Sequence, residues 1–115
     1  MSERRGKYNA RITELDGVTF DSAAEARRYQ ELKLLEQAGK IRIIELHPRF
    51  MLQEGFTDRG KKYRPITYIA DFMYFDIDAD GVIVEDVKGK RTEVFNIKMK
   101  MFIKRYPHYE FRMVK

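Results

Sequence analysis

The chain contains no cysteine, and it lacks several other patterns that would assign it to a familiar class. Without cysteine there are no disulfides and no thiolate metal site. No apolar run approaches the roughly 20 residues of a membrane-spanning helix, and the charged N-terminus does not resemble a signal peptide. There is no glycine-rich phosphate loop, no serine or cysteine nucleophile signature and no internal repeat. These absences favour a cytoplasmic protein without a membrane partner.

The residues that are present suffice for one folded domain with a basic surface. A length of 115 residues is typical of a single domain, and 43% hydrophobic residues can form a core. The net charge is +5, with basic residues concentrated near the N-terminus, at 59–64 and at 88–105. This distribution favours nucleic acid as the partner. We expect a basic N-terminal arm at 1–16 and a single domain at 17–115.

The spacing of apolar residues predicts two helices and several strands. The first helix is expected from Ser22 to about Ala38, and the second after the N-cap Thr92, ending before Pro107. Residues 54–65 contain two glycines and a proline and are expected to form a basic loop. The order is helix, strand, strand, strand, helix, strand, with strand segments at IRIIEL continuing into RFMLQ, then ITYIADFMYF, VIVEDVK and YEFRMV.

Acidic residues inside apolar strands are the most informative feature of the chain. ITYIADFMYF carries Asp71 and VIVEDVK carries Glu85, Asp86 and Lys88, and the turn DADG between them predicts a β-hairpin. Burying a carboxylate costs roughly several kcal/mol unless a cation or hydrogen bonds compensate it. Two carboxylates and one lysine at a hairpin end therefore suggest a divalent metal and a phosphate, with a plain salt bridge as the alternative.

The alternation of side chains along the second strand separates its two acids. Successive residues point to opposite faces, so Asp86 and Lys88 share one face while Glu85 points to the other. We therefore expect Asp86, and not Glu85, to be the metal ligand. Pairing within the hairpin can bring Asp71 beside Asp86.

Glu25 has two interpretations, and the sequence leaves both open. Ser22-x-x-Glu25 is a capping box, in which the glutamate side chain bonds back to the N-cap amide. In the second interpretation the helix N-terminus places Glu25 beside Asp71 and Asp86, as a further ligand of a metal or of its water.

Three further patterns have simpler explanations. DIDADG imitates the start of a calcium loop, but Val87 stands where the loop requires glutamate, so a solvated turn is expected. His47 and His108 have no second histidine at metal-ligand spacing, which favours structural or surface roles. Tyr8, Tyr63 and Tyr68 can stack on bases, although packing roles are the simpler interpretation.

Basic residues near the hairpin are the candidate contacts to nucleic acid. Lys98 lies one turn after Phe95 on the second helix and is expected near the Lys88 end of the hairpin, in contact with a phosphate. For Lys100 a solvated surface role is an equal alternative. The remaining candidates come from the segment after Lys88 and from the basic loop: Lys90, Arg91, Lys61 and Lys62.

Together these residues resemble the PD-(D/E)xK nuclease superfamily. The pattern is Asp71 followed by Asp86-Val87-Lys88 and preceded by Glu25 on a first helix. DGVTFDSAAEARRYQELKLLEQAGKI, YIADF and VEDVKGKRT are similar, in this order, to a small phage and prophage family of that superfamily, with mostly uncharacterised members. One departure is that the leading proline of the motif is absent. The resemblance implies an α/β (α+β) fold, with helices flanking a central mixed four-stranded sheet.

The resemblance also implies metal-dependent hydrolysis of a nucleic-acid phosphodiester. Asp71, Asp86 and the backbone carbonyl of Val87 would hold Mg²⁺ or Mn²⁺ with help from Glu25, and one or two ions stay open. Lys88 would position the attacking water or stabilise negative charge. We expect a phage-type endonuclease in a bacterial host cell, acting on DNA, with branched or junction DNA among its substrates. The alternatives are a catalytically silent nucleic-acid-binding module and an accessory protein of a phage replication complex.

A homodimer is the expected assembly. One core of this size carries one site and cuts one strand at a time. Symmetric cutting of a duplex or a junction needs two sites, which a two-fold homodimer supplies. The residues themselves do not distinguish DNA from RNA.

Overall fold

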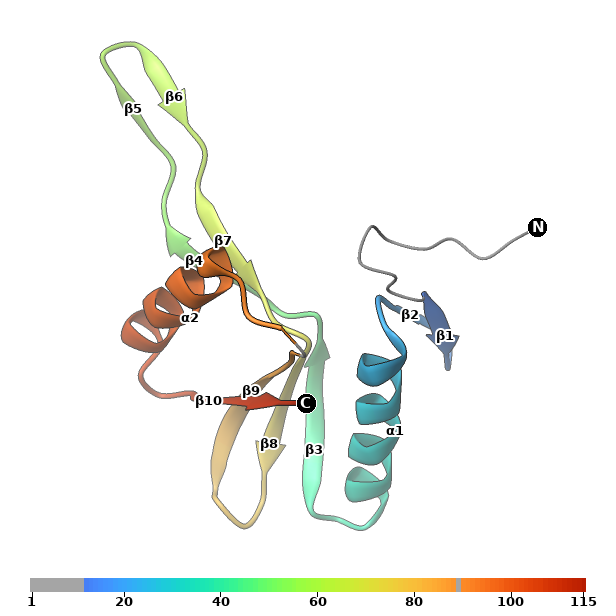
Figure 1. Cartoon of the computed structure of the whole chain (residues 1–115). Coiled ribbons are helices and arrows are strands. Elements are labelled where there is room, and N and C mark those ends of the chain that lie inside the picture. The colour runs from blue at the N-terminus through green and yellow to red at the C-terminus, as the bar shows by residue number, and fades with distance from the viewer. Residues whose placement is uncertain (1–11, 89) are drawn as a thin grey trace, which may run out of the picture.

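The structure is a computed structural model that describes residues 12–88 and 90–115. These residues form two helices and ten strands, so the fold is α+β, as the sequence predicts (Figure 1). The largest sheet is four-stranded and mixed, in the order β10-β9-β8-β3, with β10 parallel to β9 and the other pairs antiparallel. Its strands are β3 (Ile41–Leu46), β8 (Phe72–Asp76), β9 (Gly81–Val87) and β10 (Glu110–Val114).

The two helices begin and end close to the predicted positions. α1 (Ala23–Gln37) starts after Ser22, whose hydroxyl accepts a hydrogen bond from the Glu25 amide at 3.1 Å. α2 (Glu93–Arg105) starts after Thr92, which caps the Phe95 amide in the same way at 3.1 Å. In the described part of the chain, neither helix is long and apolar enough to cross a membrane.

Successive residues of β9 belong to two different hydrophobic cores. Ile83 is buried in a cluster with Ala26 and Leu32 of α1. Val84 is buried in a second cluster with Phe95 and Phe102 of α2. The two helices therefore pack on opposite sides of β9, because alternate side chains of a strand point to opposite faces.

The predicted strand ITYIADFMYF is two strands, which corrects the sequence analysis. β7 (Ile66–Ile69) pairs with β4 (Arg49–Gln53), whereas β8 pairs with β3, so the chain changes partners at Ala70 and Asp71. The partner strands β3 and β4 are also separated from each other at this place, by His47 and Pro48. His47 has a φ of 52°, and Pro48 has no amide to donate to a ladder. Asp71 therefore lies at a break between strands rather than inside one.

Residues 54–65 are not a loop, which also differs from the prediction. They contain β5 (Phe56–Asp58) and β6 (Lys61–Tyr63), an antiparallel pair that extends away from the rest of the molecule (Figure 1). The two turn residues, Arg59 and Gly60, have φ of 49° and 81°. Positive φ at both positions is the requirement of a two-residue type I′ hairpin turn. We call residues 54–65 the ribbon.

Another small hairpin begins in the predicted arm and ends in the predicted domain. β1 (Thr13–Leu15) pairs with β2 (Val18–Phe20), so the arm expected at 1–16 ends in ordered structure. Phe20 is fully buried against α1. The rest of the arm, 1–11, lies outside the described residues.

Candidate active site

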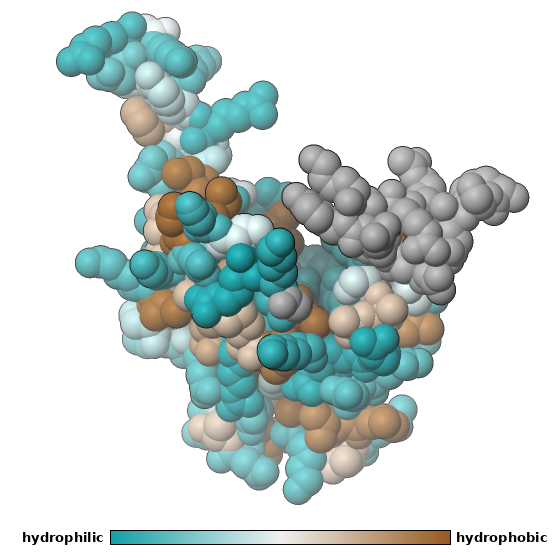
Figure 2. All heavy atoms as spheres, viewed as in Figure 1, coloured by the Kyte–Doolittle hydropathy of each residue, from teal (hydrophilic) through white to brown (hydrophobic). Residues whose placement is uncertain are grey.

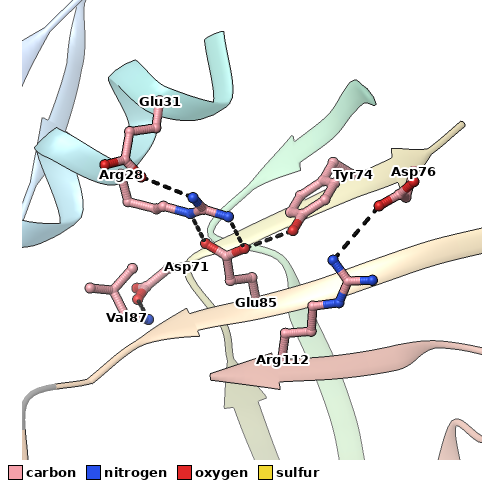
Figure 3. Close-up of polar contacts among 8 residues, drawn as sticks. All are labelled: Arg28, Glu31, Asp71, Tyr74, Asp76, Glu85, Val87 and Arg112. Carbon is pink, nitrogen blue, oxygen red and sulfur yellow. Dashed lines mark hydrogen bonds and ion pairs between the residues drawn. The ribbon is translucent and has the colours of Figure 1, made fainter. Parts of the chain in front are cut away.

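Glu85 lies on the face of β9 that packs against α1, and a cation neutralises it there. Its carboxylate accepts hydrogen bonds from Arg28 Nε at 2.6 Å and Nη2 at 2.9 Å, and from the Tyr74 hydroxyl at 2.7 Å (Figure 3). The contact with Glu85 raises the pKa of Arg28, while burial and then Glu85 raise the pKa of Tyr74 to about 12. Glu85 therefore points away from Asp86, as the alternation along the strand predicts.

Asp71 lies beside the end of β9. Its Oδ2 accepts a hydrogen bond from the Val87 amide at 2.7 Å, and its own amide donates to the Glu85 carbonyl at 3.1 Å. Burial, and next the adjacent Asp86 carboxylate, raise the pKa of Asp71 to about 8. The hairpin thus brings the two predicted acids together. Val87 meets Asp71 through its amide, so the ligand role of its carbonyl stays a prediction.

Glu25 and His47 lie next to Asp71, at the start of α1 and just after β3. Glu25 Oε2 and His47 Nε2 are 2.6 Å apart. One ligand atom each from Glu25, His47 and Asp71 lies within 4.8 Å of the other two. Burial raises the pKa of Glu25, and the contact with His47 opposes this shift. Only half of the predicted capping box forms: Ser22 caps the Glu25 amide, but the Glu25 carboxylate contacts His47 and makes no hydrogen bond to the Ser22 amide.

Asp86 is buried on the face of β9 that packs toward α2. Its Oδ2 accepts a hydrogen bond from the Tyr68 hydroxyl, so Tyr68 is a buried packing residue with a second role as a donor. An open pocket of about 320 Å³ is lined by Asp86, Lys88 and Lys98. The Lys88 ammonium lies 4.8 Å from the ring centre of Phe95. Asp86 and Lys88 therefore share one space, and Lys98 of α2 reaches the same space.

The other basic residues proposed from the sequence lie at different distances from this pocket. Lys90 and Arg91 are exposed in the connection from β9 to α2, where Arg91 Nε donates to Asn96 at 2.9 Å. Lys100 is exposed on α2 and, unlike Lys98, does not line the pocket. Lys61 and Lys62 are exposed on the ribbon and do not line the pocket.

The donor set fits a divalent cation. Within residues 12–88 and 90–115, no salt bridge to lysine or arginine reaches Asp71 or Asp86, in contrast to Glu85. Two adjacent carboxylates raise each other's affinity for a proton, and a divalent cation can take the place of that proton. Carboxylate oxygens suit Mg²⁺ and Mn²⁺, and an imidazole nitrogen adds a donor that transition metals prefer.

His47 is the residue of this cluster that sequence analysis assigned to a structural or surface role. Histidine spacing carried no signal, because its partners, Glu25 and Asp71, are 22 and 24 residues away. The usable signal is local: His47 directly precedes Pro48, at the place where two strands must break. A polar residue at a strand end, next to a second strand end at Asp71, is a candidate functional residue, because binding and catalytic side chains are frequent on the segments between strands.

Comparisons with known proteins give a family and nothing finer. Neither the curated proteins nor the solved structures provide a match to the chain. One protein family matches residues 5–115, which is nearly the whole sequence. By this match the chain belongs to the family described as "Protein of unknown function (DUF1064)".

Proposed function

We propose that the chain is a metal-dependent endonuclease of the PD-(D/E)xK type that hydrolyses phosphodiester bonds in DNA. One observation carries the proposal: ligand atoms of Glu25, His47 and Asp71 lie within 4.8 Å of one another, and the Asp86 carboxylate of β9 lies beside Asp71. Lys88 shares a pocket with Asp86. A protein that only bound nucleic acid would have no need to place two adjacent carboxylates, Asp71 and Asp86, without a lysine or arginine partner among the described residues.

The arrangement of the large sheet supports the finer assignment. Without the small hairpins, the order of elements is α1, β3, β8, β9, α2, β10, which is the order expected for the superfamily core. Helices pack on opposite sides of β9, and the acids gather at one end of the β8–β9 pair. The β4–β7 pair and the ribbon are insertions between β3 and β8.

Each side chain has a distinct role in the proposed chemistry. Asp71 and Asp86 would hold a Mg²⁺ or Mn²⁺ ion, and Glu25 would bind it directly or through water. When bound, such an ion would polarise the phosphate and lower the pKa of a bound water. Lys88 positions the attacking water or offsets the negative charge that develops on the phosphate. Lys98, in the same pocket, contacts a neighbouring phosphate.

A nuclease assay tests the proposal directly. Plasmid, single-stranded and four-way-junction DNA are incubated with the protein in Mg²⁺, in Mn²⁺ and in EDTA. We expect cleavage with either metal and none in EDTA. Binding without cleavage under every condition would instead identify a catalytically silent nucleic-acid-binding module.

Two lysine variants separate chemistry from binding. Lys88→Ala is expected to slow cleavage about 100-fold or more, with little change in DNA affinity. Lys98→Ala is the matched change in the same pocket. It is expected to weaken affinity and to lower the dependence of affinity on salt by about 0.9 in log-log slope. Cleavage by Lys88→Ala at the wild-type rate would remove Lys88 from the proposed mechanism.

The proposal includes a homodimer on DNA, since one chain carries one such cluster among its described residues. Light scattering of the free protein and of a junction complex measures the assembly. A monomer in both states, together with single-strand nicks on plasmid, would replace a junction-cutting enzyme by a nicking or flap-type nuclease.

A further inference from the structure

The ribbon has the dimensions of an element that enters a groove. Two paired strands lie about 4.8 Å apart, so with their side chains they fit the major groove of B-form DNA, which is about 12 Å wide. The Arg59-Gly60 turn closes the pair in two residues. The base is also fixed: a side chain at Gly55 would lie 2.9 Å from the Tyr63 carbonyl oxygen and 3.1 Å from Pro65.

The ribbon carries apolar surface that the protein leaves exposed. Phe56 and Tyr63 stack with ring centres 4.9 Å apart, yet they are 50% and 40% exposed. An isolated two-stranded hairpin is at best marginally stable in water. A persistent hairpin with an exposed aromatic pair is thus typical of a surface that a partner covers.

The charge of the ribbon indicates what this partner is. Residues 54–65 contain four lysines and arginines and two acids. Lys61 pairs opposite Asp58, on the same face as the aromatic pair, whereas Lys62 pairs opposite Thr57 on the other face, which carries no acid in β5 or β6. Figure 2 shows hydrophilic residues covering the end of the ribbon. Cations on such a ribbon are complementary to the phosphates that flank the major groove, and an exposed apolar ring can contact the thymine methyl groups that line it.

The position of the ribbon relates it to the candidate active site. β7 leads from the base of the ribbon to Asp71, so a single strand connects the two. Eleven residue steps separate Gly60 from Asp71, which corresponds to at most about 36 Å of extended chain. One turn of B-form DNA is about 34–36 Å long. A ribbon in the groove and a phosphate at Asp71 can therefore belong to the same turn of duplex.

We propose that the ribbon inserts into the major groove of B-form DNA and selects duplex DNA as the substrate. This inference rests on the proposed nuclease function and names its substrate class. Double-stranded RNA is excluded by shape, because the major groove of the A-form is too narrow and deep for side chains to read. Single strands are bound less well, because they offer no groove.

Fluorescence anisotropy in EDTA tests the proposal without requiring cleavage. The probes are a DNA duplex, the RNA duplex of matching sequence and single-stranded DNA, each with 30 nucleotides per strand. Wild-type protein is expected to prefer the DNA duplex. Replacing 56–63 by Gly-Gly is expected to weaken binding to that duplex at least about 30-fold and to remove the preference over RNA.

A point variant keeps the test valid if the deletion does not fold. Lys62→Ala is expected to weaken duplex binding roughly threefold and to lower its salt slope by about 0.9. The matched control is Lys40→Ala, an exposed lysine before β3 at the opposite end of the sheet, where no change is expected. Equal affinities and slopes for the two lysine variants would overturn the proposal.

Two further outcomes would also overturn it. A ribbon deletion that turns a dimer into a monomer by light scattering, with unchanged DNA affinity, would identify an arm between two copies of the chain. A preference for the RNA duplex would identify a different substrate. Since binding is measured in EDTA, loss of the ribbon's effect and failure of the nuclease assay are independent results.

Discussion

The carboxylates of β9 lie in two regions of opposite character. On the α1 face, Glu85 receives three hydrogen bonds, two of them from Arg28. On the other face, Asp86 accepts a hydrogen bond from the Tyr68 hydroxyl and lies beside Asp71. Among the described residues, no lysine or arginine forms a salt bridge with Asp71 or Asp86. Neighbouring residues on one strand thus have different electrostatic environments.

The difference distinguishes an acid that is paired with a cation inside the fold from the two acids that we propose as metal ligands. A buried ion pair with all its hydrogen bonds satisfied needs nothing further. Adjacent buried carboxylates without a cation cost stability unless a proton or a metal is bound. The predictions below are arranged around this contrast.

The largest effect is expected from breaking the paired region. Arg28→Ala leaves Glu85 buried without a cation and is expected to cost about 3–5 kcal/mol in the free energy of unfolding. Urea denaturation measures this change. Replacing both residues, as in Arg28→Met with Glu85→Leu, should recover most of the loss, because no buried charge remains. A single variant as stable as wild type would show that the pair is dispensable.

The second prediction concerns the unpaired region. Asp86→Asn keeps an acceptor for Tyr68 but removes a charge, and we expect at least about 100-fold slower DNA cleavage. The same change should leave stability in EDTA unchanged or higher, because it relieves repulsion with Asp71. Isothermal titration with Mn²⁺ should show weaker binding. Full Mn²⁺ affinity in this variant would exclude Asp86 as a ligand.

A smaller effect is expected at His47. His47→Gln removes the imidazole beside Glu25, and we expect about tenfold weaker Mn²⁺ binding. Mg²⁺ binding should change less, because imidazole is a better ligand for Mn²⁺ than for Mg²⁺. Titrations with both ions give the ratio. Equal losses for the two ions would indicate that His47 orients Glu25 without touching the metal.

The last prediction is a dependence of stability on pH in the absence of metal. The pKa of Asp71 is raised from 3.8 to about 8 in the folded protein, so folding favours its protonated form. The stabilisation is complete below about pH 4 and is lost as the pH rises to about 8. We expect the melting temperature in EDTA to fall across this range.

Asp71→Asn provides the control for this pH dependence. The variant cannot lose a proton at this position, so its melting temperature should fall less between pH 5 and pH 8. In the wild-type protein, saturating Mn²⁺ at pH 8 should restore the stability that is lost with the proton, since the cation replaces the proton. A wild-type and a variant curve of equal slope would remove Asp71 as the source.

The sequence predicted the elements whose signals are local. The start of α1 follows from Ser22 and the end from Gly39, which has a φ of 76°. The opposite directions of Glu85 and Asp86 follow from the alternation of a strand, which holds wherever both faces are covered. The adjacency of Asp71 and Asp86 followed from a hairpin with a short turn.

Features that depend on a distant partner were missed. The division of ITYIADFMYF is caused by Pro48, which lies about twenty residues away and shapes the neighbouring strand. Gly60 and Pro65 predict irregular structure for the ribbon, whereas pairing of Phe56 with Tyr63 makes it regular. Arg28 was not recognised as the partner of Glu85, because 57 residues separate them.

The Arg28–Glu85 pair has a consequence for how β9 is aligned in the sheet. A slip of one residue in the register of a strand moves every side chain to the opposite face. Such a slip would leave Glu85 beside Tyr68 and would turn Asp86 toward α1, so the acid cluster would be lost. The buried pair favours the correct register, because a one-residue slip puts Val84 or the shorter side chain of Asp86 in the place of Glu85 beside Arg28. A salt bridge outside the candidate site thereby determines which acid enters it.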